Sequence, residues 1–238
     1  MFRHLIVLSS SYKLGKRIAL HLLKTDEDLS VFNSLINLDI FKYCTVYSVE
    51  TDSETWLSVV KYDDFYKDIY ICTDKKEFID LINLNKDISI FDLSKYILVY
   101  LKDKGLDYSQ LKLQKLAYFC YEKYLINYKS KLFKEKIYAW KYGPVIKTLY
   151  NKTKTKEDLK NLFIDLDSYS TRQRIIFSEN GLEKLKIIDN VLEKLAALSA
   201  KDLTELSHKK GSAWSTWDGK LRNYEITDIS ILNSYKKN

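Results

Sequence analysis

Proline and glycine are scarce in this chain, which has 1 proline and 6 glycines in 238 residues. Long flexible linkers, collagen-like repeats and glycine-rich phosphate loops need far more of these residues, so the composition argues against all three. Because few residues interrupt helices, we expect helix-rich packing.

Metal ligands and nucleophiles are just as few, with 3 cysteines and 3 histidines. No CxxC pair and no HExxH motif occurs, so the sequence predicts reduced thiols, no metal site and no cofactor. A cysteine nucleophile paired with a distant histidine has no local signature here, and Cys120 is more simply a small core residue. We therefore predict no catalytic residue and a protein that is not an enzyme. The residues considered are Cys44, Cys72, Cys120, His4, His21 and His208.

Long apolar runs are also absent. The longest clean run, Tyr96–Leu101, is far shorter than the roughly 20 residues that a membrane helix needs. The apolar run Leu5–Leu8 is short and has no cleavage site after it, so it predicts a first strand rather than a signal peptide. We expect no membrane partner and a cytoplasmic location.

The formal charge of +7 is distributed unevenly along the chain. Residues 1–88 contain 11 Lys and Arg against 14 Asp and Glu, whereas residues 89–238 contain 28 against 18. Excess positive charge attracts nucleic acid or an acidic protein surface, and charge alone does not choose between them.

The apolar pattern of residues 1–88 predicts a small α/β domain. Strands are expected at 5–8, 43–49, 56–61 and 69–73. Helices are expected from the spacing of Leu14, Ile18 and Leu22, over 32–40, and after Asp74 as an N-cap. The turn Ser9–Ser11 before the first of these helices could receive an anion. A nucleotide-binding or enzymatic role of this domain therefore stays open as an alternative.

Residues 89–238 have helical spacing over most of their length and predict a mostly α-helical domain with no strand, so that the whole chain is of the α+β class. Pro144 fits just inside a helix start, with Gly143 in the turn before it. The segment 152–160 is expected to be a solvated connection. N-caps are expected at Ser89, Ser109, Ser178 and Ser199. The helix after Ser109 carries an apolar stripe formed by Leu113, Leu116, Ala117, Cys120 and Tyr124.

A lysine cluster with interleaved aromatic residues keeps nucleic-acid binding open as an alternative. No recognisable reader helix follows the cluster, and its aromatic residues fall in segments that we expect to pack in the core. A protein partner is therefore the better interpretation. The cluster consists of Lys129, Lys131, Lys134, Lys136 and Lys141 with Tyr128, Phe133, Tyr138 and Trp140.

Three blocks in the second domain form a pattern. Residues 111–119 read LKLQKLAYF, and residues 133–150 contain F-x-E-x-I-x-AWxYGPV followed by a tyrosine. A weaker third block runs from Leu203 to Trp214 and has Ser207 where the pattern usually has threonine. Together the blocks resemble the Panacea domain of SocA-like antitoxins over about residues 89–220. Residues 1–88 lie outside the resemblance.

The resemblance implies a bacterial antitoxin or inhibitor that neutralises a toxin by direct protein contact, and SocA-like members can also act as proteolytic adaptors. On a phage or mobile element, the same scaffold would instead block a host defence enzyme, as an anti-CRISPR protein does. Residues 1–88 become the candidate partner-specificity domain, and residues 89–238 the Panacea-type domain. The identity of the partner and the oligomeric state stay open.

The polar and aromatic members of the motifs are candidates for partner binding, with internal hydrogen bonding as the alternative. The apolar members of the motifs are expected to pack in the core, and the Gly-Pro pair is expected to shape the backbone. The partner-binding candidates are Gln114, Lys115, Trp140, Lys141, Tyr142, His208 and Trp214, and the structural residues are Leu113, Leu116, Phe119, Gly143 and Pro144.

Overall fold

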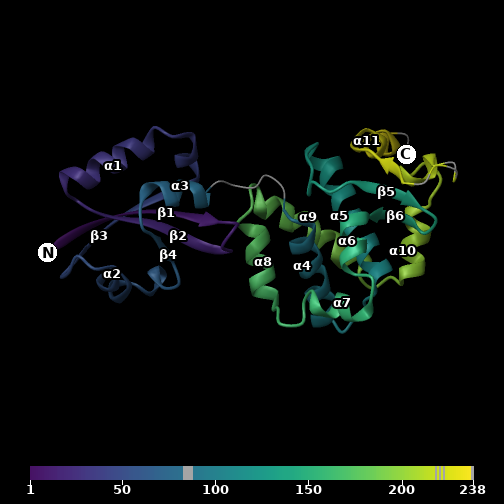
Figure 1. Ribbon diagram of the computed structural model, residues 1–238, viewed down its shortest axis with the longest axis horizontal. Coiled ribbons are helices and arrows are strands. Elements are labelled where there is room, and N and C mark those ends of the chain that lie inside the picture. Colours follow the sequence, from purple (N-terminus) through teal and green to yellow (C-terminus); the bar gives the residue numbers. More distant parts are fainter. Residues whose placement is uncertain (83–87, 218, 220, 222, 237–238) are drawn as a thin grey trace. The chain divides into compact units, whose positions relative to one another are not determined.

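The chain forms two compact units, Met1–Asn85 and Lys86–Asn238 (Figure 1). The computed structural model describes residues 1–82, 88–217, 219, 221 and 223–236. The α+β class is confirmed, because a unit built on a sheet precedes a mostly helical unit. Within the described ranges, no helix combines the length and the apolar character needed to cross a membrane.

The first unit is built on a four-stranded sheet with the strand order β3-β1-β2-β4. β1 pairs antiparallel with β2 and with β3, and β4 pairs parallel with β2. Side chains alternate along β1, so Val7 packs with α1 and α3 on one face and Ile6 packs with α2 on the other. The elements are β1 (Phe2–Ser11), β2 (Lys16–Leu23), α1 (Asp26–Ile36), β3 (Thr45–Thr51), α2 (Trp56–Tyr62), β4 (Tyr70–Cys72) and α3 (Lys75–Ile82).

The hairpin β1–β2 overturns the helix predicted from Leu14, Ile18 and Leu22. Gly15 has φ +62° and lies in the turn between the strands. A spacing of four fits a strand as well as a helix, since residues two apart share one face, and Ile18 and Leu22 point into the same core. The predicted anion site at Ser9–Ser11 also fails, because these residues lie in β1 and no helix follows them.

The strand predicted at 56–61 is wrong as well, because these residues form α2. Val59 is fully buried and Trp56 packs on the same cluster, so the segment buries one helical face. Valine favours strands because its branched side chain packs well on a pleated sheet surface. In this segment the valines pack on the sheet from a helix, and this tertiary packing outweighs the local preference. The strands near 5–8, 43–49 and 69–73 and the helix after Asp74 are confirmed, whereas the helix predicted at 32–40 begins earlier, at Asp26.

The second unit surrounds α5, which packs against α4, α9, α10, α11 and a three-stranded sheet of order β6-β5-β7. The predicted stripe from Leu113 to Tyr124 is buried, and polar residues of the same helix are buried beside it. The elements are α4 (Ile90–Asp103), α5 (Gln110–Tyr128), β5 (Ile137–Trp140), β6 (Gly143–Ile146), α6 (Lys147–Lys152), α7 (Lys156–Asn161), α8 (Ser168–Ile176), α9 (Gly181–Leu195), α10 (Ala200–Ser207), β7 (Tyr224–Ile226) and α11 (Asp228–Lys236).

The small sheet corrects the expectation of a second domain without strands. Pro144 lies inside β6 rather than at a helix start. Proline lacks the N–H that a strand with two neighbours would use. Among the described residues β6 has a strand neighbour on one side only, so proline is tolerated.

Two further expectations in this unit are wrong. The segment 152–160 contains most of α7, which begins with a capping box between Thr155 and Asp158. The N-cap of α9 is Asn180, in the left-handed conformation, and not Ser178, whose hydroxyl donates to the Ile175 carbonyl. The caps at Ser89, Ser109 and Ser199 are confirmed.

Candidate partner-binding surface

The hairpin formed by β5 and β6 carries the most exposed motif residues. Lys141 and Tyr142 form its turn, between the paired residues Trp140 and Gly143. Tyr142 is 61% exposed, and the Lys141 ammonium lies 5.5 Å from the centre of its ring. The turn therefore presents a cation and an aromatic ring together.

Two side chains of α5 occupy the edge of β6 on which the described part of the chain places no strand. Gln114 Oε1 accepts a hydrogen bond from the Ile146 N–H at 2.8 Å, and its Nε2 donates to the Ile146 carbonyl at 3.3 Å. Lys115 Nζ donates to the Pro144 carbonyl at 2.9 Å. The Gln114 amide thus takes the place of a neighbouring strand, and the helix fixes the position of the hairpin.

Burial of Lys115 has an electrostatic cost. Its side chain is fully buried, and this burial lowers its pKa to about 7.

Gly143 has φ +98°, and a Cβ at this position would lie 2.6 Å from Lys115 Nζ and 2.7 Å from Ser207 Oγ. Only glycine combines this backbone conformation with room for the two side chains.

Aromatic rings that follow α10 pack beside the hairpin. The His208 ring stacks on Trp214 at 3.5 Å between centroids, and Trp217 meets Trp214 edge-on at 5.9 Å. The Trp214 indole N–H donates to the Trp140 carbonyl at 2.9 Å, and the Trp217 indole N–H donates to the Leu221 carbonyl at 2.9 Å. Burial, and then the charge of Lys115, lower the pKa of His208, which favours a neutral ring.

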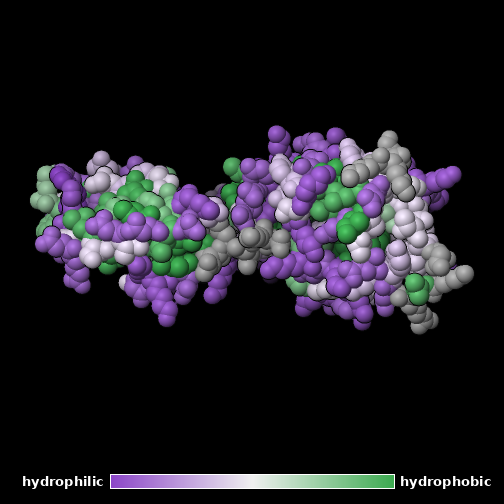
Figure 2. Space-filling model, turned by 90° about the horizontal axis from the view of Figure 1, so that it is seen from above, coloured by the Kyte–Doolittle hydropathy of each residue, from purple (hydrophilic) through white to green (hydrophobic). Residues whose placement is uncertain are grey.

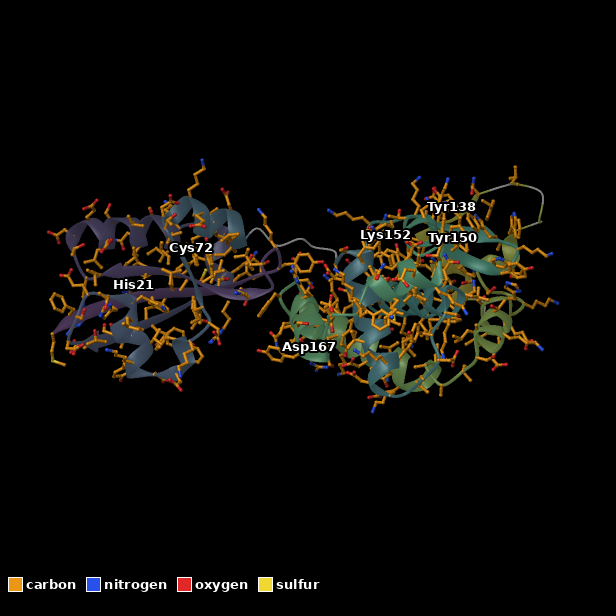
Figure 3. All side chains as sticks on the ribbon, turned by 60° about the horizontal axis from the view of Figure 1, so that its bottom comes forward. His21, Cys72, Tyr138, Tyr150, Lys152 and Asp167 are labelled. Atoms are coloured by element: carbon orange, nitrogen blue, oxygen red, sulfur yellow. The ribbon has the colours of Figure 1, made fainter. Side chains whose placement is uncertain are left out.

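Trp140 is fixed by its own contacts. Its indole N–H donates to Asn223 Oδ1 at 3.2 Å, and its ring meets Tyr150 of α6 at 4.9 Å. Tyr138 lies two residues earlier on β5 and therefore on the same face of the sheet. Tyr138 and Tyr150 are labelled in Figure 3, in the second unit.

These contacts bring together three of the four tryptophans of the chain. All three indoles are only half-buried, although their N–H groups are satisfied. Figure 2 shows apolar side chains of each unit bordered by hydrophilic ones. We use the name tryptophan surface for Trp140, Lys141, Tyr142, His208, Trp214 and Trp217.

The structure distributes the predicted partner-binding residues over two layers. Five of the seven candidates lie on the tryptophan surface, whereas Gln114 and Lys115 lie beneath it and bond to backbone. Sequence reasoning missed Trp217 and Asn223, although a tryptophan three residues after Trp214 is itself a signal for a cluster. The predicted structural residues Leu113, Leu116, Phe119, Gly143 and Pro144 are all buried.

The described residues contain no group of three or more His, Cys, Asp or Glu side chains that could hold a metal ion. Burial raises the pKa of the thiols of Cys44, Cys72 and Cys120, so their reactive thiolate forms are disfavoured. His4 and His21 hydrogen bond to each other through Nδ1 and Nε2 at 2.7 Å, and His4 Nε2 bonds to Thr51 Oγ1 at 2.8 Å. This histidine pair joins strands of the first unit.

Comparison with known proteins points to the unit that carries the tryptophan surface. Residues 113–215 match the family model described as antitoxin SocA-like, Panacea domain. A relative named Antitoxin SocA, from Caulobacter vibrioides (strain NA1000 / CB15N), is 30% identical over 108 residues, which are 44% of this chain and 57% of that protein. No solved structure matches the chain. Part of the second unit is therefore similar to the Panacea domain of SocA-like antitoxins.

Proposed function

We propose that this protein is an antitoxin that neutralises a partner protein by binding it at the tryptophan surface, without catalysis. The observation that carries the proposal is the clustering of three half-buried indoles beside an exposed tyrosine. Tryptophan and tyrosine dominate the binding energy of protein interfaces, because they bury a large area at a small entropic cost. The match to SocA-like antitoxins supports the same role.

The charge around this surface supports an acidic partner. Lys141 lies over the Tyr142 ring, and Lys209 and Lys210 follow His208 in the chain. All three are exposed, and none forms an ion pair with an acidic residue among those described. An acidic protein surface would complement these cations, accelerate association and fix the orientation of the complex. A toxin or a defence enzyme with an acidic patch meets this requirement.

The lysine cluster suits nucleic acid less well. Lys136 pairs with Glu225 at 2.8 Å, and Lys131 pairs with Asp228 at 3.7 Å. Phe133 is fully buried and cannot stack on a base. Since two of the cations are already paired and an aromatic residue is inside, a protein partner is favoured over a nucleic acid.

The test takes each protein encoded beside this chain's gene, asks whether it is toxic and rescued by co-expression of this chain, and uses the rescued protein in a pull-down with the purified full chain. We expect Trp217→Ala and Tyr142→Ala to weaken binding at least about tenfold, as loss of an interface aromatic residue does. Tyr169→Ala is the matched control, because Tyr169 is a 74% exposed aromatic residue on α8, away from the tryptophan surface. Equal binding by all three variants, each with an unchanged melting temperature, would refute the assignment of this surface.

A further inference from the structure

β3 is an edge strand of the first unit. It spans Thr45–Thr51 and pairs with β1 on one side, and the sheet order places no described strand on its other side. Its register with β1 runs without interruption from the pair Phe2–Thr51 to the pair Leu8–Thr45, so no bulge distorts it.

The hydrogen bonds of β1 show which β3 groups are unpaired in the sheet. The Lys24 N–H donates to the Arg3 carbonyl at 3.0 Å, which continues the β1–β2 register. Alternate residues of a strand turn their backbone groups to opposite neighbours, so Arg3 and Leu5 face β2, whereas His4 and Ile6 face β3. Their partners on β3 are Val49 and Tyr47, and the same alternation adds Thr51 and Thr45, which pair with Phe2 and Leu8. The backbone groups of Val46, Ser48 and Glu50 consequently point away from the sheet.

This edge lacks the usual protection. Natural edge strands carry lysine, proline, a bulge or an inward-pointing charge, which prevent pairing with another strand. β3 contains no proline and no lysine, and its single charged residue, Glu50, is paired with Arg3. The sequence Thr45–Val49 is uncharged, and Val46 is 37% exposed. The strand is thus open to addition of a further strand.

We propose that the occupant is β3 of a second copy of this chain, which forms a two-fold dimer with a continuous eight-stranded sheet. Antiparallel pairing centred on Ser48 sets Val46 of one copy opposite Glu50 of the other. Every outward N–H and C=O of one copy then meets an outward group of its equivalent. No like charges face each other in this register.

Side chains support the same register. Tyr47 of one copy lies opposite Val49 of the other, which is a favourable pair of an aromatic and a β-branched residue. The Tyr47 ring already packs edge-on against Tyr66 at 6.1 Å and in a tilted arrangement against Phe65 at 5.5 Å. The added strand therefore extends an existing apolar cluster.

The test is the mass of the full chain in solution, measured by sedimentation equilibrium from low to high micromolar concentration. We expect a concentration-dependent dimer that Ser48→Ala retains and Ser48→Pro weakens at least tenfold, because proline removes only an N–H that points away from β1. A wild-type protein that is monomeric throughout, or a dimer that Ser48→Pro leaves intact, would overturn the proposal.

A charge swap makes the test independent of proline. Ser48 faces its own equivalent across the two-fold axis, so Ser48→Lys and Ser48→Glu should each prevent self-association by like-charge repulsion. An equimolar mixture of the two variants should form the dimer again. Failure of the mixture to associate, with both variants folded by circular dichroism, would count against pairing centred on Ser48.

Discussion

Replacement of Lys115 by methionine should change how the stability of the second unit depends on pH. The folded pKa of about 7 lies well below the value of 10.5 for an exposed lysine. Between these two values the unfolded chain binds a proton that the folded chain does not, so the free energy of unfolding rises with pH. Burial of Lys115 consequently costs most stability below pH 7, and the cost disappears as pH approaches 10.5.

The size of the effect follows from the two pKa values. The slope approaches about 1.4 kcal/mol per pH unit, and integration from pH 7 to pH 9 gives about 2 kcal/mol in favour of the wild type. Lys115→Met removes this contribution together with the hydrogen bond to Pro144. Urea unfolding followed by tryptophan fluorescence, for both proteins at half-unit steps of pH, isolates the difference because the other titrations cancel. A stability difference that stays constant from pH 7 to pH 9 would show that the buried ammonium keeps an ordinary pKa.

Three other substitutions test the geometry. Gly143→Ala should lower the free energy of unfolding by at least about 2 kcal/mol in urea titrations, because the residue has φ +98° and a Cβ meets Lys115; an unchanged midpoint would contradict this. Trp140→Ala should cost about 2 kcal/mol, less than for a fully buried aromatic residue, and unchanged stability with lost partner binding would assign the indole to the interface alone. Burial, and then His4, lower the pKa of His21 to about 4, so the first unit should lose stability as pH falls from 6.5 towards 4. The dependence should be weaker in His21→Gln, and an equal dependence in the variant would exclude the histidine pair as its cause.

The long helices α4, α5 and α9 of the second unit were predictable because their apolar patterns have one interpretation. The stripe from Leu113 to Tyr124 continues for three turns, and no strand of that length would bury the same residues. The spacing of Leu14, Ile18 and Leu22 repeats every four residues and fits both helix and strand. The strand forms because Gly15 allows a tight turn and because β1 is also paired with β3, which is distant in sequence. The pattern of the local sequence does not reveal that distant pairing.

The sequence predicted most residues of the candidate site, but it did not predict which of them are exposed and which are buried beneath the surface. A lysine and a glutamine in a motif suggest exposed contacts, because such side chains are rarely buried. Gln114 and Lys115 are inside because the unpaired edge of β6 supplies backbone partners for them. That edge exists only because residues 137–146 form a hairpin instead of the expected helix start at Pro144.

The hairpin of β5 and β6 connects the buried side chains of Gln114 and Lys115 to the exposed residues of the tryptophan surface. α5 holds β6 through Gln114 and Lys115, and the Trp214 indole holds the end of β5 through the Trp140 carbonyl. Side chains already fixed in this way lose little conformational freedom when a partner binds, so more of their contact energy appears as affinity. A Gln114→Ala variant would leave the Ile146 N–H unpaired without changing any exposed residue. It should therefore weaken partner binding by loosening the hairpin, mainly through faster dissociation, and this change in the dissociation rate measures how far the affinity depends on preorganisation.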